Sequence, residues 1–295
     1  MENRILHCFN WKIQDIKKSL NIIKDCGFTS ILVSPLQKCK YDDNKCWWGL
    51  YQPYGNSSDY IGNLLGSKND LKELCDESHK CGIKIIQDIV TAHTANDDYN
   101  ELKPNDKVDK KLTNNKWFWK EKRNIENWND MWQVKNLCMH LPGLDLSNYE
   151  LQDIIITMLD EYKRIGVDGF RVDAAKNISF SFFARVMNRY KSEYNMAEVI
   201  NVPNNMLNKY MELGINVLTN VTGGDHYKKI VFSESHDSYL NMDDNGYTRN
   251  IPEYIINRDY YELCKQYPNT IYYTRPFSDS WKSGIVREAN LLHIK

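Results

Sequence analysis

Two opposite charges stand two residues apart in an apolar stretch near the middle of the chain. Residues 169–176 read GFRVDAAK, and the apolar and β-branched residues predict a buried strand. Arg171 and Asp173 then point to the same face of that strand. Because burying a carboxylate is costly without a compensating cation, we expect Arg171 to keep Asp173 ionised. An ionised, positioned carboxylate can act as a nucleophile or a base, although a structural ion pair at a strand end is the alternative.

Polar residues also end three other predicted strands, at 88–93 (DIVTAH), 197–199 (AEV) and 234–237 (ESHD). In a barrel of parallel strands such residues meet at the C-terminal mouth, where several carboxylates can be ionised together only at high cost. A proton held by one carboxyl beside a charged one defines a general acid and a nucleophile, as in glycoside hydrolysis. The residues expected to converge are Asp173, Glu198 and Asp237, with His93 and His236 beside them.

Strand-like and helix-like segments alternate along the chain and supply the elements that must position these residues. The helix-like segments cover 13–26, a stretch from the capping box of Ser67 and Asp70 to Gly82, 150–165, 180–191 and 203–213. Repeated strand and helix order predicts parallel strands in a closed (β/α)8 TIM barrel, an α/β fold. An open doubly wound sheet competes, but no Gly-rich phosphate turn follows any strand. The eight predicted strands are 4–10, 30–34, 83–90, the strand of Arg171 and Asp173, 194–199, 215–221, 230–235 and 270–274.

Two departures from even spacing predict the domain organisation. About fifty residues of mixed polarity, with four tryptophans, follow the third strand and predict a small inserted subdomain over residues 94–145, here called the insert. The catalytic barrel then comprises residues 1–93 and 146–295. The segment 222–229 is too short for a full helix, so we expect the sixth helix to be reduced. Helical spacing near the end predicts a short closing helix with Trp281, Ile285, Ala289 and Leu292.

Composition excludes several classes of function. The 295 residues carry a formal net charge of −1, which gives no nucleic-acid footprint, and no apolar stretch approaches the ~20 residues that cross a bilayer. The first strand starts too early for a leader, so we expect a soluble, cytoplasmic monomer. The eight cysteines lack CxxC spacing and are expected to be reduced, with Cys39 and Cys46 the one pair that could form a disulfide. No two of the His and acidic residues have a chelating spacing such as HExxH, which argues against a catalytic metal.

The chain resembles the α-amylase family of retaining glycoside hydrolases, and its amylase branch most closely. The resemblance runs from residues 6–11 (LHCFNW) to 273–276 (YTRP), nearly the whole chain. Each motif alone is weak, but all of them occur in the right order and on the predicted strands. The matching stretches between these ends are 47–53 (WWGLYQP), 88–93, 141–145 (LPGLD), 169–176, 197–199 and 234–237.

The resemblance implies a role for each matching residue. Asp173 would be the nucleophile, Glu198 the general acid and base, and Asp237 the stabiliser of the transition state. Arg171 would keep Asp173 charged. A pyranose ring offers a flat face of C–H groups to aromatic side chains. The implied substrate-binding residues are Tyr51 under the sugar, Trp47 and Trp48 in adjacent subsites, His93 and His236 as hydrogen-bond partners, Lys176 beyond the scissile bond, and Gln52.

Departures from the family pattern bear on cofactors. Ala92 stands where many members have an Asn that helps to bind a structural calcium ion. Asp145 matches another ligand position, but one carboxylate is a weak calcium site, since Ca²⁺ takes six or more oxygen ligands. Ser235 replaces the Asn of the chloride-dependent members, so we expect no chloride requirement, and Asn177 replaces a common His. The chemistry itself needs no cofactor, and the family's C-terminal β-sandwich is not expected in this chain.

Three functions remain open on this sequence. The first is hydrolysis of internal α-1,4-glucosidic bonds in starch- or glycogen-type glucans by a retaining double displacement. The second is transglycosylation, or exo-acting α-glucosidase activity, with the same acids. The third is a protein that binds glucans without catalysis.

Overall fold

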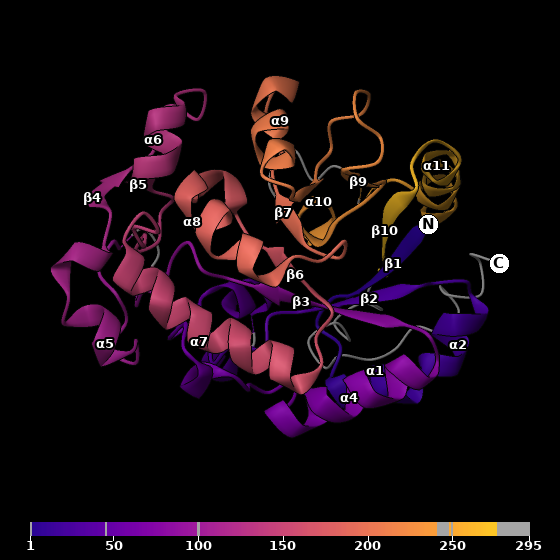
Figure 1. Ribbon diagram of the computed structural model, residues 1–295, viewed down its shortest axis with the longest axis horizontal. Coiled ribbons are helices and arrows are strands. Elements are labelled where there is room, and N and C mark those ends of the chain that lie inside the picture. The colour runs from indigo at the N-terminus through magenta and orange to yellow at the C-terminus, as the bar shows by residue number, and fades with distance from the viewer. Residues whose placement is uncertain (1, 45, 99–100, 241–247, 249, 276–295) are drawn as a thin grey trace.

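Eight parallel strands form a closed barrel in the computed structural model, which describes all residues except 1, 45, 99–100, 241–247, 249 and 276–295 (Figure 1). The order around the barrel is β1-β10-β9-β8-β7-β6-β3-β2. This confirms the predicted (β/α)8 barrel and excludes the open sheet. The strands are β1 (Asn3–Cys8), β2 (Ser30–Val33), β3 (Lys84–Ile89), β6 (Gly169–Val172), β7 (Met196–Glu198), β8 (Asn216–Leu218), β9 (Lys229–Phe232) and β10 (Asn269–Tyr273).

The strands are buried on both faces, as their apolar sequences predict. One set of side chains fills the barrel interior, and the other set packs against the surrounding helices. The interior layer takes one residue from each of seven strands, namely Ile5, Leu32, Ile86, Met196, Leu218, Ile230 and Ile271.

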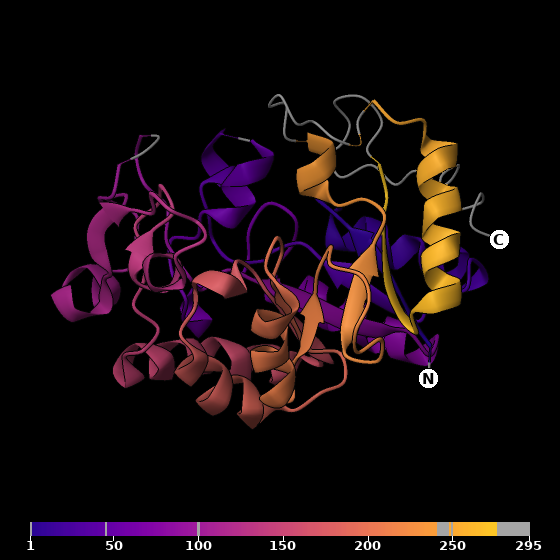
Figure 2. The same cartoon turned by 90° about the horizontal axis from the view of Figure 1, so that it is seen from above.

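Helices surround the barrel, and α11 stands upright along its side in Figure 2. The predicted capping box is present at the start of α4, where Asp70 N donates to Ser67 Oγ and Ser67 N to the Asp70 carboxylate. The prediction of one continuous helix over 13–26 is wrong, because the segment forms two helices that are separated at Ser19. The hydroxyl of Ser19 donates to the backbone carbonyl of Asp15. The helices are α1 (Ile13–Lys18), α2 (Leu20–Asp25), α3 (Tyr41–Asn44), α4 (Lys68–Lys80), α7 (Tyr149–Ile165), α8 (Phe180–Arg185), α9 (Asn204–Glu212), α10 (His236–Leu240) and α11 (Glu253–Gln266).

The segments that connect the strands in the second half of the chain differ more from the predicted elements. Residues 219–228, between β8 and β9, contain no helix, which agrees with a reduced sixth helix. The segment predicted as a helix over 180–191 forms α8 and then a 3₁₀ turn, Met187–Tyr190. Sequence analysis did not predict α11, which buries Ile256 and Tyr260 against the barrel. The predicted closing helix with Trp281, Ile285, Ala289 and Leu292 lies outside the described residues.

The insert forms a separate cluster of short elements, on the left of Figure 1. Its small core consists of Ile125, Val134 and Leu137. Three of its four tryptophans are exposed and take no part in that core: Trp117, Trp128 and Trp132. The boundaries at residues 94 and 145 remain a prediction. The elements of the insert are α5 (Lys110–Thr113), a 3₁₀ turn (Lys116–Phe118), β4 (Glu121–Asn124), α6 (Met131–Asn136) and β5 (Leu137–Cys138).

All eight cysteines are free thiols in this structure, so Cys39 and Cys46 form no disulfide here. Among the described residues, none of the helices has the length and apolar character that a membrane span requires.

Candidate active site

The predicted acids lie at or beyond the C-terminal ends of the barrel strands β6, β7 and β9. Glu198 is the last residue of β7, Asp173 follows the last residue of β6, and Asp237 lies in α10, five residues beyond the end of β9. Residue Arg171 of β6 pairs in register with Asp88 of β3 and with Met196 of β7. The side chains from these strands therefore meet at one end of the barrel, where the active sites of such barrels form.

Arg171 joins three carboxylates. Its Nη1 donates to both oxygens of Asp88 at 2.8 Å and to Asp173 Oδ1 at 2.9 Å. Its Nη2 donates to Glu198 Oε1. The arginine side chain is only 3% exposed, and the three carboxylates are 0%, 11% and 13% exposed. One cation thus compensates up to three buried negative charges.

This charge balance favours a proton within the cluster. Burial raises the pKa of Asp88 to about 6, although Arg171 acts to lower it. Burial also raises the pKa of Asp173 well above its ordinary value; Arg171 opposes this rise, and the charges of Glu198 and Asp88 add to it. Arg171 therefore acts on Asp173 in the predicted direction, but burial and the neighbouring carboxylates outweigh it. The site can hold a protonated and an ionised carboxyl side by side.

Asp88 is a central member of the cluster that sequence analysis did not identify as a site residue. Besides Arg171, its carboxylate accepts a hydrogen bond from the Tyr51 hydroxyl at 3.0 Å. The sequence feature that could have identified Asp88 is an acidic residue inside a strand that is expected to be buried on both faces. Its partner Arg171 lies 83 positions later, and only the pairing of β3 with β6 brings the two together.

A backbone N–H of a residue in the left-handed conformation binds the Glu198 oxygen that Arg171 does not bind. Ala174, directly after Asp173, has a φ of 47°. Its backbone N donates to Glu198 Oε2 at 3.0 Å. Both oxygens of Glu198 therefore have partners, which fixes the orientation of this carboxyl. A non-glycine residue in this conformation is strained, as is common in functional sites.

His236 lies between two aromatic rings. Its ring stacks on Phe9 with centroids 4.7 Å apart and on Tyr51 with centroids 5.1 Å apart. Burial lowers the pKa of His236 to about 3, so the imidazole is neutral at ordinary pH. Its Nε2 lies 3.5 Å from Asp237, whose side chain is 45% exposed and is the most accessible of the three predicted acids. Phe9, which sequence analysis did not select, thus helps to orient this part of the site.

His93 is buried below the aromatic residues. Its Nε2 donates to the backbone carbonyl of Tyr51 at 2.7 Å, and burial lowers its pKa to about 4. Its Nδ1 is buried without a partner in the described part of the chain. Both ring nitrogens are therefore buried in this structure, and Nδ1 is the one left to bind a ligand.

The remaining predicted binding residues lie in different surroundings. Trp47 packs edge-on against Phe9 and His236, and Trp48 is 39% exposed. The carbonyl oxygen Oε1 of the Gln52 side chain is buried without a partner among the residues described. On the side of the insert, Lys176 Nζ lies 5.1 Å from the ring centre of Trp128.

The calcium positions do not fit a divalent cation. Ala92 supplies no side-chain oxygen, and Asp145 Oδ1 already accepts hydrogen bonds from Ser147 N and Oγ at 3.0 and 2.7 Å. Among the described residues there is no group of three His, Cys, Asp or Glu side chains arranged to hold a metal ion. Asp145 is the one carboxylate at these two positions, whereas a calcium ion takes six to eight oxygen ligands.

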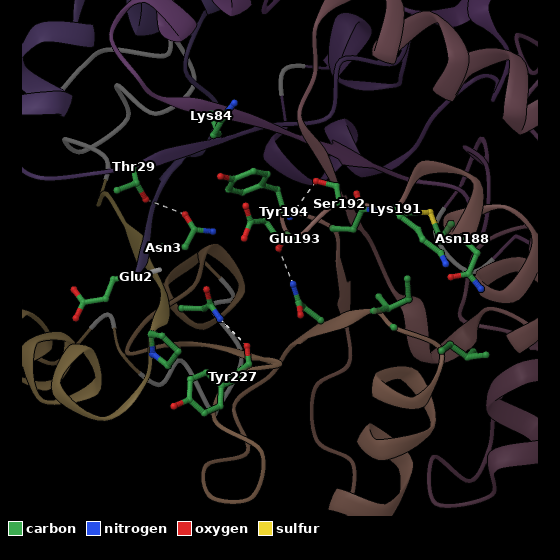
Figure 3. A pocket seen from close by; sticks show the side chains of 18 of the residues that line it. Glu2, Asn3, Thr29, Lys84, Asn188, Lys191, Ser192, Glu193, Tyr194 and Tyr227 are labelled. Atoms are coloured by element: carbon green, nitrogen blue, oxygen red, sulfur yellow. Dashed lines mark hydrogen bonds between the residues drawn. The ribbon is translucent and has the colours of Figure 1, made fainter.

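A wide hollow of about 1060 Å³ lies at the opposite end of the barrel, where the strands begin (Figure 3). Its polar side chains bond within the protein. Asn3 accepts from Thr29, Asn216 donates to the carbonyl of Glu193, and Asn269 donates to that of Tyr227. The hollow lies at the starts of the strands and is therefore remote from the carboxylate cluster.

Comparison with known proteins adds an independent line of support. The family described as "Alpha amylase, catalytic domain" matches residues 12–250. An α-amylase from Clostridium acetobutylicum is 34% identical over 177 residues, which cover 59% of this chain and 23% of that protein. An α-amylase from Aeromonas hydrophila is 29% identical over 204 residues, which cover 59% of this chain and 43% of that protein. The chain thus spans less than half of the length of these relatives.

Solved structures share the fold. Wild-type α-amylase I from Eisenia fetida superposes with a TM-score of 0.78 at 18% identity, covering 94% of this chain and 67% of that chain. The α-amylase from Geobacillus thermoleovorans, complexed with acarbose, superposes with a TM-score of 0.74 at 19% identity, covering 99% of this chain and 76% of that chain.

Proposed function

Because the chain belongs to the α-amylase catalytic-domain family, we propose that it hydrolyses internal α-1,4-glucosidic bonds of starch- or glycogen-type glucans with retention of configuration. One observation carries this proposal. Asp173 and Glu198 bind the two terminal nitrogens of the same buried guanidinium, at the end of the barrel where catalytic residues lie.

The shared guanidinium favours a short separation of the two carboxyls. Retaining glycosidases hold their carboxyls about 5 Å apart, whereas inverting enzymes leave roughly 6.5–9.5 Å for a water molecule. Two carboxylates bound to one guanidinium fit the shorter separation. Glu198 would act as the general acid and protonate the glycosidic oxygen while Asp173 attacks the anomeric carbon. Deprotonated Glu198 would then activate water, and the second displacement restores the α configuration.

Asp237 would stabilise the transition state, in which positive charge develops on the sugar ring. Its exposed carboxylate is accessible to a ligand in the mouth. Arg171 would hold both reacting carboxylates in place. Asp88 would hold Arg171 through two hydrogen bonds and would orient Tyr51 through a third.

The proposed substrate is an α-1,4-linked glucan chain. A variant of Eisenia fetida α-amylase I, similar in fold to this chain, has been solved with maltohexaose. Trp47, Trp48 and Tyr51 would contact flat sugar faces, and His93, His236 and Gln52 would supply hydrogen bonds. Lys176 would contact the sugar on the leaving-group side.

The test is a reducing-sugar assay on soluble starch, with product analysis on maltoheptaose. Asp173→Asn, Glu198→Gln and Asp237→Asn should each lower turnover by several orders of magnitude without unfolding the protein. Asp153→Asn, which changes an exposed carboxylate on α7, is the matched control and should retain activity. Wild-type activity in any of the three variants would refute the assigned roles.

The products distinguish the other candidate functions. Oligosaccharides longer than maltoheptaose indicate transglycosylation, and glucose as the sole early product indicates exo action. Retention of the chain on starch without reducing-end release indicates a binding protein.

A further inference from the structure

Two lysines of the insert donate to three consecutive carbonyls of the loop that follows the catalytic strand. Lys120 Nζ donates to the carbonyl of Asn177 at 2.7 Å and to that of Leu137 at 3.4 Å. Lys135 Nζ donates to the carbonyls of residues 176 and 178 at 3.3 and 2.8 Å. We refer to these two ammonium groups and the carbonyls of residues 176–178 as the lysine clamp.

The side chain of Lys120 is buried, and that of Lys135 is partly buried. Lys120 is only 9% exposed, and burial lowers the pKa of Lys120 to about 8 and that of Lys135 to about 7. Within the described part of the chain, neither forms an ion pair with a carboxylate. Lys135 also lies 4.0 Å from the ring centre of Phe180. Backbone carbonyls and an aromatic face therefore solvate these cations, which a buried charge requires.

The clamp holds the insert against the catalytic loop from both sides. Asn177 Nδ2 returns a hydrogen bond to the carbonyl of Val134 in α6 at 3.0 Å. The same loop begins with Ala174, whose backbone N holds Glu198. The contacts of the insert are thus two to four residues from the backbone N of Ala174, which orients a proposed catalytic carboxyl.

The clamp also lies beside the two positions at which the family resemblance places calcium ligands. Lys120 N donates to the carbonyl of Gly143, and Leu144 N donates to that of Ala92. The segments that carry Lys120, Asp145 and Ala92 are therefore hydrogen-bonded neighbours. A site built from ammonium donors and backbone carbonyls suits a resident positive charge and repels a divalent cation.

We propose that Lys120 and Lys135 do here what a structural calcium ion does in calcium-binding members of the family, so that this chain joins its insert to its barrel without a metal. The lysines satisfy the carbonyls with covalently attached cations, which no chelator can remove. The clamp acts whether or not the site hydrolyses glucans.

The first test uses the wild-type chain with EDTA or with added CaCl₂. We expect the thermal midpoint, followed by circular dichroism, to be unchanged by either addition, and we expect calorimetric titration with CaCl₂ to show no binding that stabilises the fold. A midpoint that rises with CaCl₂ and falls with EDTA would overturn the proposal.

The second test compares Lys120→Met and Lys135→Met with Lys122→Met. Lys122 is exposed in β4, next to the clamp in sequence, and is the matched control. We expect each clamp variant to lose amide protection in residues 131–138 and 174–178 in hydrogen exchange, and to be cleaved in the insert roughly tenfold faster or more, because charge-assisted hydrogen bonds are lost. Lys122→Met should behave like the wild type.

Clamp variants with the same protection and cleavage rate as Lys122→Met would refute the role of the lysines. If Lys120→Met does not fold while Lys122→Met does, the essential contribution of the buried ammonium is supported, and Lys120→Arg should restore folding because it keeps a cation at this position.

Discussion

Removal of the Arg171 side chain should be among the most destabilising single changes in the barrel. In Arg171→Met, a side chain of similar length replaces the guanidinium and leaves Asp88, Asp173 and Glu198 without their shared cation. Breaking a buried ion pair by removing one partner costs about 3–5 kcal/mol, because the remaining charge is uncompensated. The burial of Arg171 and of its three partners places this cluster in that class.

The cost should depend on pH, because the carboxylates can escape it by taking up protons. Without Arg171, which lowers the pKa of both Asp88 and Asp173, these pKa values rise further. The destabilisation should therefore be largest near pH 8 and should shrink as the pH falls to about 5. At roughly 2 °C for each kcal/mol in a domain of this size, the thermal midpoint should fall by about 6–10 °C near neutral pH.

Urea unfolding followed by circular dichroism measures this cost, and the double variant Arg171→Met/Asp88→Asn tests its cause. If uncompensated charge is responsible, removing one carboxylate should make the double variant more stable than Arg171→Met alone. A double variant that is equally or less stable would refute the reasoning. Arg189→Met, which removes an exposed partner of Asp160, is the control and should change stability by at most about 1 kcal/mol.

Three further predictions follow from individual contacts. Tyr51→Phe should lose about 1 kcal/mol of stability in urea unfolding, because the hydrogen bond to Asp88 is removed. Tyr51→Phe should retain starch hydrolysis, whereas Tyr51→Ala should reduce kcat/KM at least tenfold. Ser67→Ala should cost about 1 kcal/mol through loss of the capping box, and an unchanged urea midpoint would contradict the contribution of that cap. For His236, the pKa of about 3 lies below that of the unfolded chain, so the unfolded state binds more protons between about pH 3 and 6.5 and acid destabilises the fold. Replacement of His236 by Phe should preserve the stack on Tyr51. In urea titrations it should reduce the loss of stability on acidification by up to about 1.4 kcal/mol per pH unit. A loss equal to that of the wild type would exclude this histidine as the cause.

The eight strands were predictable because each is a short apolar run with covered faces, and the residues at their C-terminal ends followed from strand order alone. The break at Ser19 was not predictable from periodicity, because the apolar stripe of Ile13, Ile16, Leu20 and Ile23 continues through it. A side-chain hydroxyl that bonds to a backbone carbonyl ends the first helix. The helix α11 was missed because its charged and polar residues obscure the few buried positions.

Part of the candidate site could also be predicted from the sequence, and part could not. Sequence motifs selected Asp173, Glu198 and Asp237 as candidates, since each follows or ends an apolar run. The place of Asp88 and the contact of Lys120 with residues 174–178 depend on which distant segments become neighbours. Spacing along the chain carries no information on such contacts, and only the closed barrel and the docking of the insert create them.

The hydrogen bonds of Arg171 limit the substitutions that this protein can accept during evolution. Its guanidinium connects carboxylates on or next to three adjacent strands, β3, β6 and β7. Loss of Arg171 alone should therefore lower stability and disturb the arrangement of the site together, because all three carboxylates lose their shared cation. In a library selected only for heat resistance, with no substrate present, Arg171 should therefore remain unchanged wherever its three carboxylates are kept, while substitutions accumulate in the outer helices.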